Sequence, residues 1–346
     1  MIYINIPIME ICGDEVTKGN LPLEWNNNRP LTLPEIDHIL HSMKINQVEY
    51  NFDHKTNVNS KVEIKKISRE IDLASKQMED IFKHIGRGGD VPLSEIKKDI
   101  LPTIKQAAEI PHLYHLFYEL NSKDEYTYRH MICVGIIATM IGRWINLPKE
   151  ELEHLTLGAT LHDVGKTKIS NDILNKPGKL TKEEYETMKL HTMYGYELLK
   201  GIKGLDERVA IVALQHHERE DGGGYPFRLV NRQIDIHSKI VAIADVFHAM
   251  SSARVYHKAA PLHVVIKQMQ EDAFGKLDPN ILLVFLYKMM NSLTGKQVQL
   301  TNGAEGTIIM IHPYDPLRSL VRVEDTLIDL RYNKHLQIEK VLEDNQ

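Results

Sequence analysis

The chain has few cysteines and no long uncharged apolar run. Its 346 residues include only Cys12 and Cys133, which form neither a disulfide framework nor a CxxC pair, so a reducing compartment is favoured. The longest apolar runs, residues 134–145 and 281–290, are each interrupted by a basic residue and fall short of the roughly eighteen residues of a membrane span. No basic region precedes the first apolar residues, so no secretory signal is predicted and a cytoplasmic location is expected.

An excess of positive charge is also absent. The 47 acidic residues outnumber the 42 basic ones, for a net charge of -5, which argues against binding of polymeric nucleic acid through its phosphate backbone. A basic groove for a small anionic ligand stays open. An apolar content of 42% and a charged content of 26% are typical of a globular protein, and the length allows two or three domains.

The pattern along the chain predicts four regions. Residues 1–50 alternate isoleucines and then show a short helical pattern over 32–43, which indicates a small mixed α/β module. Residues 51–100 contain a polar linker (51–60) and a helical pattern (61–85), so we expect a helical linker or packing region that could also mediate homodimerisation. Residues 101–295 are expected to be helical, and residues 296–346 carry short β-type runs separated by turn residues, including 313–316, which indicates a small β module.

Two adjacent pairs, His162-Asp163 and His216-His217, lie about fifty residues apart in apolar sequence. Helical spacing turns further histidines toward apolar faces, and one aspartate lies within the apolar run 240–247. Each buried imidazole or carboxylate needs a partner, and a shared cation satisfies all of them. The residues concerned are His130, His162, Asp163, His191, His216, His217 and Asp245.

Imidazole and carboxylate without thiolate suit iron, manganese or zinc. The two adjacent pairs suggest two metals bridged by one carboxylate, and Asp163 is the predicted bridge. Of the remaining histidines, His312 is expected to be an ordinary surface or turn residue, and His237 shows nothing specific.

The order of these motifs resembles the HD-GYP subfamily of the HD phosphohydrolase superfamily, whose typical members cleave the bacterial signalling molecule cyclic di-GMP. The similarity runs over residues 124–279, from the segment ending in His130, through His162-Asp163-Val164-Gly165-Lys166 and Gly224-Tyr225-Pro226, to Asp245. The resemblance implies an HD-type all-helical catalytic domain and the seven metal ligands named above. It also implies that Lys166, Tyr225 and Arg254 face the substrate, and the metals of the family are usually iron or manganese.

The chain departs from the family pattern at four points. Tyr126 replaces a glutamate that binds a third metal in some members, so two divalent metal ions are predicted rather than three. His248 replaces a second aspartate after Asp245. The segment from Arg254 to His257 keeps the arginine but lacks the cation that usually ends it. Glu220 replaces a tryptophan and is expected to place a negative charge near the substrate loop.

The predicted reaction is hydrolysis of a phosphodiester. A hydroxide bridging the two metals and aligned by Asp163 would attack phosphorus, and Lys166 would stabilise charge on the phosphate oxygens. Residues 222–224 are glycines that would let backbone approach a ligand, and Tyr225 could stack on a guanine or donate a hydrogen bond to a phosphate. Together with these residues, the resemblance implies a cyclic di-GMP phosphodiesterase that produces pGpG, GMP or both. A hydrolase of another cyclic dinucleotide or nucleotide, and a cyclic di-GMP sensor without turnover, are the alternatives.

Overall fold

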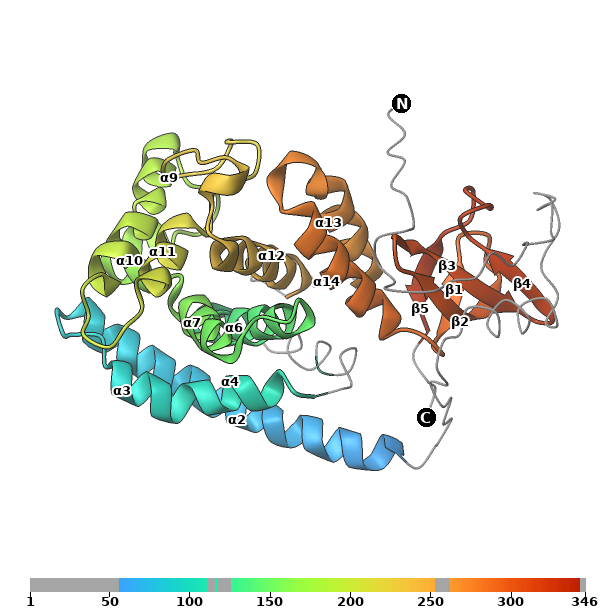
Figure 1. Ribbon diagram of the computed structural model, residues 1–346, viewed down its shortest axis with the longest axis horizontal. Coiled ribbons are helices and arrows are strands. Elements are labelled where there is room, and N and C mark those ends of the chain that lie inside the picture. The colour runs from blue at the N-terminus through green and yellow to red at the C-terminus, as the bar shows by residue number, and fades with distance from the viewer. Residues whose placement is uncertain (1–55, 111–115, 117–125, 253–261, 343–346) are drawn as a thin grey trace, which may run out of the picture.

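The structure, a computed structural model, describes residues 56–110, 116, 126–252 and 262–342. The predicted N-terminal module of residues 1–50 lies outside this part. The described chain is mainly helical and carries a small antiparallel sheet near its C-terminus (Figure 1), so the predicted fold class is confirmed. Among the helices of the described part, none is long and apolar enough to cross a membrane.

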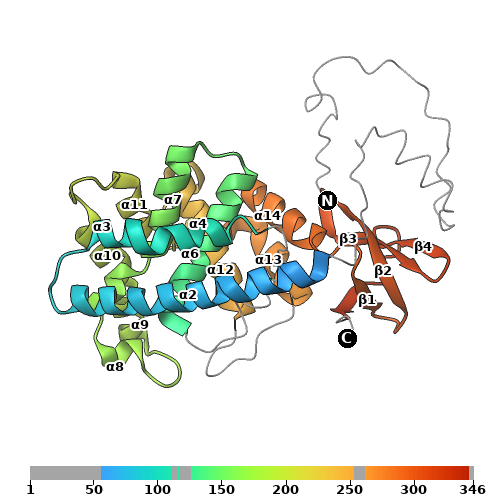
Figure 2. The ribbon, with the colours of Figure 1, turned by 90° about the horizontal axis from the view of Figure 1, so that it is seen from below.

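The first described element is the long helix α2 (Thr56–Gly86). Its helical periodicity places isoleucine, methionine and phenylalanine side chains on one buried face, as predicted. The predicted polar linker over residues 51–60 needs correction, because the helix already begins at Thr56. Figure 2 shows α2 running along one side of the helical part, where it packs against α4 (Leu101–Ala107) and α6 (Tyr126–Trp144).

The central helix α6 is buried along most of its length, because other helices surround it. It packs against α2, against α7 (Lys149–Leu161) and against α12 (Ile236–Ser251). The remaining helical elements are α3 (Leu93–Glu95), η2 (Ile96–Ile100), η3 (Val164–Lys168), α8 (Asn171–Leu174), α9 (Lys182–Lys189), α10 (His191–Leu199), α11 (Glu207–Gln215), η4 (Asn231–Gln233), α13 (Leu262–Lys276) and α14 (Pro279–Asn291).

Two helices begin at residues that are typical of helix starts. Pro148 is the N-cap residue of α7. The capping box before α9 forms in both directions: the Glu184 backbone N–H donates to Thr181 Oγ1 at 3.2 Å, and the Thr181 N–H donates to the Glu184 carboxylate at 2.7 Å. The helices between residues 101 and 293 therefore follow the sequence pattern closely wherever the structure describes them.

The C-terminal sheet has the strand order β4-β3-β2-β1-β5, with all neighbours antiparallel. Its strands are β1 (Gln297–Leu300), β2 (Glu305–His312), β3 (Asp315–Val323), β4 (Thr326–Asp329) and β5 (Ile338–Val341). The first four match the predicted runs, but β3 begins within the predicted turn 313–316, and β5 was not predicted. The sheet lies beyond α13 and α14 at one end of the molecule (Figure 1). Buried residues of the sheet such as Val298, Ile308 and Val321 join those of the helices in one hydrophobic core, whereas Leu320 and Leu327 form a small cluster of their own.

Candidate metal centre

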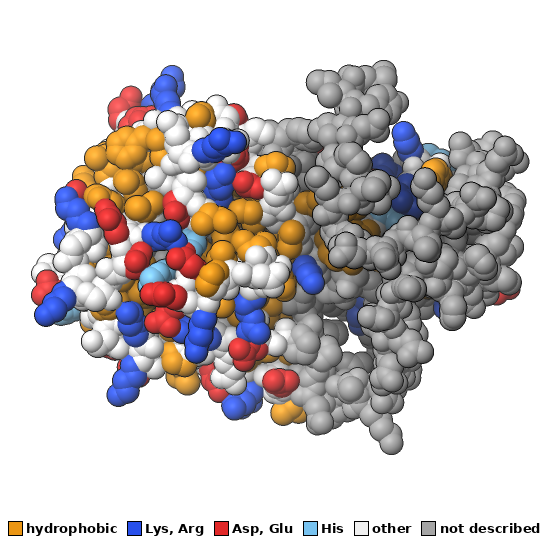
Figure 3. Space-filling view, viewed as in Figure 1, with side chains coloured by type: hydrophobic (Ala, Val, Ile, Leu, Met, Phe, Trp, Pro, Cys, Tyr) orange, Lys and Arg blue, Asp and Glu red, His pale blue; other side chains and the backbone are white. Residues whose placement is uncertain are grey.

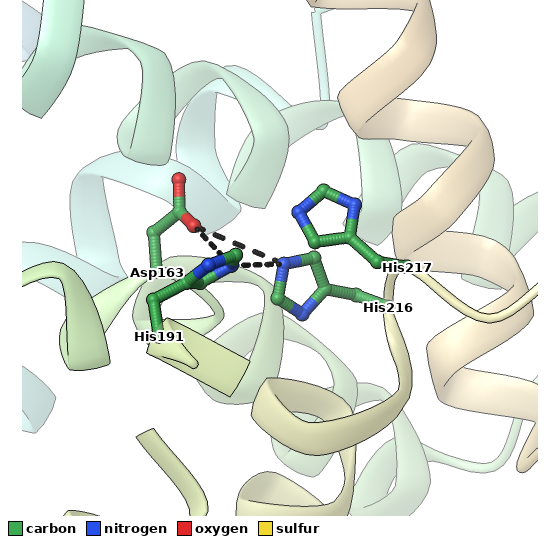
Figure 4. A group of neighbouring side chains, drawn as sticks. All are labelled: Asp163, His191, His216 and His217. Carbon is green, nitrogen blue, oxygen red and sulfur yellow. Dashed lines mark hydrogen bonds and ion pairs between the residues drawn. The ribbon is translucent and has the colours of Figure 1, made fainter. Parts of the chain in front are cut away.

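Two groups of histidine and aspartate side chains meet in the middle of the helical part. The first group is Asp163, His191, His216 and His217, and the second is His130, His162 and Asp245; within each group the candidate ligand atoms lie within 4.8 Å of one another. Figure 4 shows the four side chains of the first group pointing toward one another. The structure thus brings all seven predicted metal-binding residues together, and adjacency of His162 and Asp163 joins the two groups.

Helix ends position three of these seven side chains. His162 follows α7, His216 follows α11, and His191 is the first residue of α10. In each, the Nδ1–H donates to a backbone carbonyl about one turn earlier: His162 to Ala159 at 2.7 Å, His191 to Met188 at 2.7 Å, and His216 to Ala213 at 3.0 Å. These bonds fix the ring orientation and leave Nε2 as the nitrogen that faces the centre.

Asp163 contacts members of both groups. Its Oδ1 lies 3.4 Å from His191 Nε2 and 3.8 Å from His216 Nε2, while its Oδ2 lies 3.3 Å from His162 Nε2. Within the described part of the chain, the buried atoms His162 Nε2 and Asp163 Oδ1 have no hydrogen-bond partner. Buried polar atoms without hydrogen bonds are costly, and a divalent cation would satisfy both. The donor set therefore fits a metal.

Burial and charge set the protonation states that a metal requires. Burial, helped by neighbouring histidines, lowers the pKa of His216 well below its ordinary range and that of His217 to about 3. Burial alone would raise the pKa of Asp163, but Lys166 and His162 outweigh it and hold that pKa well below the usual value. At neutral pH these two imidazoles are neutral and the carboxylate is ionised, which are the forms that bind metals. His162 differs, since the nearby carboxylates outweigh burial and raise its pKa.

Lys166 reaches back to the centre from η3. Its Nζ lies 2.5 Å from Asp163 Oδ2, so the lysine is not the solvated helix-end residue that its position alone would suggest. The preceding Gly165 allows η3 to touch α10: a Cβ atom at this position would lie 1.9 Å from the His191 carbonyl oxygen and 2.4 Å from the Gly195 nitrogen. A side chain at position 165 would thus separate Asp163 from His191.

Glu218, a residue that the sequence pattern did not single out, fixes the segment after His217 by hydrogen bonds. Glu218 is buried, and its carboxylate accepts hydrogen bonds from the backbone N–H groups of Phe227, at 2.7 Å, and Leu229, at 2.9 Å. Tyr225 lies in the same segment, and its ring packs on the His217 ring, with centroids 4.7 Å apart and planes inclined by 32°. One face of Tyr225 is therefore covered by a candidate metal ligand.

A family model described as HD domain matches residues 106–281, slightly more than half of the chain. The chain belongs to the HD domain family. Phosphohydrolases with this domain bind divalent metals, and the His/Asp centre of this HD domain could hold them. The resemblance seen in the sequence motifs is confirmed.

Relatives of this HD domain protein carry names that state an activity on cyclic dinucleotides. The cyclic di-GMP phosphodiesterase PA4108 of Pseudomonas aeruginosa is 34% identical over 59% of this chain and 49% of its own length. The cyclic di-GMP phosphodiesterase response regulator RpfG of Xanthomonas campestris is 41% identical over 41% of this chain and 38% of its length. The 3'3'-cGAMP-specific phosphodiesterase 3 of Vibrio cholerae is 31% identical over 54% of this chain and 40% of its length. The chain thus spans at most about half of these relatives.

The departures of this HD domain from the family pattern have different outcomes. Glu220 forms an ion pair with Lys239, whose Nζ lies 3.0 Å from its carboxylate and also 3.1 Å from that of Asp278. His248 is buried beside His130, with their Nδ1 atoms 2.8 Å apart. Arg254 and the side chain of Tyr126 lie outside the described residues.

Two histidines outside the centre differ from expectation. His312, predicted to be a surface or turn residue, is buried in the sheet with its Nε2 3.4 Å from Asp329 Oδ1. His237, which showed no specific signal, is fully buried with its Nε2 3.1 Å from Glu151 Oε2. Neither belongs to the two groups of candidate ligands. The candidate centre is partly open, since His217 and Asp245 are half-buried. On the face drawn in Figure 3, small patches of histidine lie among acidic and basic side chains over the helical part.

Proposed function

We propose that this chain is a metal-dependent phosphodiesterase that hydrolyses cyclic di-GMP to pGpG, GMP or both. The observation that carries the proposal is the buried centre in which Asp163 contacts two groups of candidate ligands. Relatives that are 34% and 41% identical and are named cyclic di-GMP phosphodiesterases support the choice of substrate.

The proposal includes two divalent metal ions, iron or manganese. His130, His162 and Asp245 would hold one, and Asp163, His191, His216 and His217 would hold the other, with Asp163 placed to serve both. Imidazole and carboxylate donors without thiolate suit these metals. When bound, a metal pair lowers the pKa of a water molecule toward 7 and neutralises phosphate oxygens.

The residues around the ligands have roles of their own. Lys166 holds the Asp163 carboxylate in place and ionised, and its half-buried ammonium group can also attract the oxygens of a phosphodiester. Glu218 fixes the segment that carries Tyr225, so the tyrosine forms one wall of the substrate site. With one ring face on His217, Tyr225 contacts substrate through its other face, its edge or its hydroxyl group. Arg254 remains a proposed substrate contact.

The decisive experiment combines metal analysis with product analysis. Protein purified without oxygen should contain about two metal ions per chain, and chromatography should show conversion of cyclic di-GMP to pGpG or GMP. Asp163→Asn, which removes the charge at nearly constant volume, should abolish turnover and reduce metal content. Asp172→Ala, at an exposed aspartate on α8, is the matched control and should leave both unchanged. Fewer than one metal per chain, or unaltered turnover in Asp163→Asn, would refute the proposal.

The same assay separates the competing functions. The relative named a 3'3'-cGAMP-specific phosphodiesterase makes that dinucleotide the first competing substrate. Faster cleavage of 3'3'-cGAMP than of cyclic di-GMP would replace the substrate but keep the mechanism. Metal-loaded protein that binds cyclic di-GMP without cleaving it would identify a sensor instead.

Two further parts of the proposal concern the setting of the enzyme. A cytoplasmic location fits a chain with two cysteines and no framework of disulfides. A homodimer formed through the N-terminal helical region is also proposed, and light scattering of the full chain measures it directly. A mass of one chain at micromolar concentration would contradict the dimer.

A further inference from the structure

His248 contacts the candidate ligand His130 on the ring nitrogen that faces away from Asp245. It lies on α12, three residues after Asp245, and its side chain is buried. Its Nδ1 is 2.8 Å from His130 Nδ1, while His130 Nε2 is 3.0 Å from Asp245 Oδ1. Both nitrogens of the His130 ring therefore contact residues of the same helix.

This arrangement differs from that of three other candidate ligands. The Nδ1 atoms of His162, His191 and His216 face backbone carbonyl oxygens. A carbonyl oxygen only accepts hydrogen bonds, so each of these rings carries its proton on Nδ1 and keeps the Nε2 lone pair for a metal. His130 faces a ring nitrogen instead, and a ring nitrogen can either accept or donate.

Two neutral imidazoles in this contact share one proton between their Nδ1 atoms, which allows two arrangements. If His130 donates to His248, the Nε2 lone pair of His130 is available to a metal. If His248 donates, the proton of His130 resides on Nε2, where it donates to Asp245 and blocks coordination. A group that only accepts would allow the first arrangement alone.

We propose that His248 is a positioning residue that sets the tautomer of His130 and thereby the metal affinity of the group formed by His130, His162 and Asp245. The inference rests on the proposed function, because it assumes that this group binds a metal. A neutral acceptor that can also donate supports His130 less strongly than a carboxylate would. His248 accordingly makes this group bind its metal more weakly than a carboxylate at position 248 would.

Three other side chains can place an atom of different chemistry at the position of His248 Nδ1. His248 Nδ1 is separated from Cβ by two bonds, as are Oδ1 of asparagine and aspartate and the Cδ atoms of leucine. His248→Asn replaces the nitrogen with a neutral acceptor, His248→Asp with a charged acceptor, and His248→Leu with an atom that cannot accept. His237→Asn is the matched control, because His237 is a buried histidine of the same helix whose Nε2 faces Glu151 instead.

The experiment measures the two Mn²⁺ affinities of the full chain by competition with a coloured chelator under anaerobic conditions. His248→Leu should weaken one of the two sites about 10- to 100-fold, which is the usual effect of losing a group that orients a metal ligand. His248→Asp should tighten the same site about 10-fold or more, and His248→Asn should bind at least as tightly as the native chain. His237→Asn should leave both sites unchanged.

The opposite directions expected for leucine and aspartate keep the test decisive, because a misfolded variant does not bind Mn²⁺ more tightly. If the leucine variant fails to fold, the comparison of asparagine and aspartate with the native chain decides. Equal Mn²⁺ affinities in the native, asparagine and aspartate proteins would overturn the role of His248, and retained cleavage of cyclic di-GMP would then leave the proposed function standing. A native chain that binds neither Mn²⁺ nor Fe²⁺ would overturn both.

Discussion

Replacing Gly165 by alanine is the sharpest test of how the centre is assembled. The new Cβ atom would lie 1.9 Å from the His191 carbonyl oxygen, whereas real Cβ atoms essentially never come closer than 3.0 Å to another heavy atom. Because both contacts of the new atom are backbone atoms, no side-chain rotation relieves the overlap. Either η3 or α10 must move by about 1.1 Å, the difference between these two distances.

That movement displaces residues of the candidate metal centre. Asp163 and Lys166 flank Gly165, and His191 begins α10, so the 3.4 Å contact between Asp163 and His191 must open. Overpacking of this kind costs about 1–3 kcal/mol or more of unfolding free energy. A displacement of about 1 Å among reacting groups lowers the rate about 100-fold. We expect both losses in Gly165→Ala, together with reduced metal content.

Urea unfolding, metal analysis and initial rates measure these three effects. Gly86→Ala is the matched control, because its Cβ atom would also face η3 but at an ordinary 3.8 Å from the Thr167 carbonyl oxygen. This control should stay within about 1 kcal/mol of the native chain. Native stability and metal content in Gly165→Ala would show that the contact between η3 and α10 does not determine the geometry of the centre.

Three further outcomes are expected. Glu218→Gln should lower the unfolding free energy by about 1–3 kcal/mol and raise KM for cyclic di-GMP, because an amide offers one acceptor oxygen where the carboxylate has two. Glu207→Gln, at an exposed glutamate, is its control. An equal KM in both variants would contradict the role of Glu218 in fixing the segment that carries Tyr225. The unfolding free energy of the metal-free protein should fall as the pH drops below about 6.5, because His216 and His217, the latter with a pKa of about 3, take up protons only on unfolding. The slope approaches about 1.4 kcal/mol per pH unit for each such histidine. Urea titrations at pH 7 and pH 5.5 measure this change, and equal unfolding free energies at the two pH values would contradict it. Removing metal with a chelator should lower Tm, since a ligand at 100 times its Kd adds about 2.7 kcal/mol; an unchanged Tm would argue against tight binding.

The candidate ligands could be predicted because their signal is local. His130, His162, His191 and His216 lie at helical positions that face apolar neighbours, and all four are buried in the structure. Periodicity also predicted α2 and the first four strands. Its errors fall at element ends, where Thr56 already belongs to a helix and Asp315 already begins a strand, because end positions depend on what the flanking residues contact.

The features that the sequence did not predict depend on contacts between distant segments. Glu218 is one charged residue in a polar run, and only the folded loop shows that it binds two backbone N–H groups. His312 and His237 are buried because Asp329 and Glu151 lie beside them in the fold. The strand β5 is short and polar at an edge of the sheet, so it lacks the apolar alternation that marks a strand.

The continuous core of the helices and the sheet limits how this chain can be divided. The composition changes near Gly295, but α14 packs against β2 and β3, and buried residues such as Phe285, Val298 and Ile308 belong to one hydrophobic cluster. A shortened chain that ends after α14 would expose apolar surface to water and favour aggregation. Expression of the helical part therefore requires the sheet to be kept, and an exchange of this sheet for another would have to rebuild the surface that α14 presents.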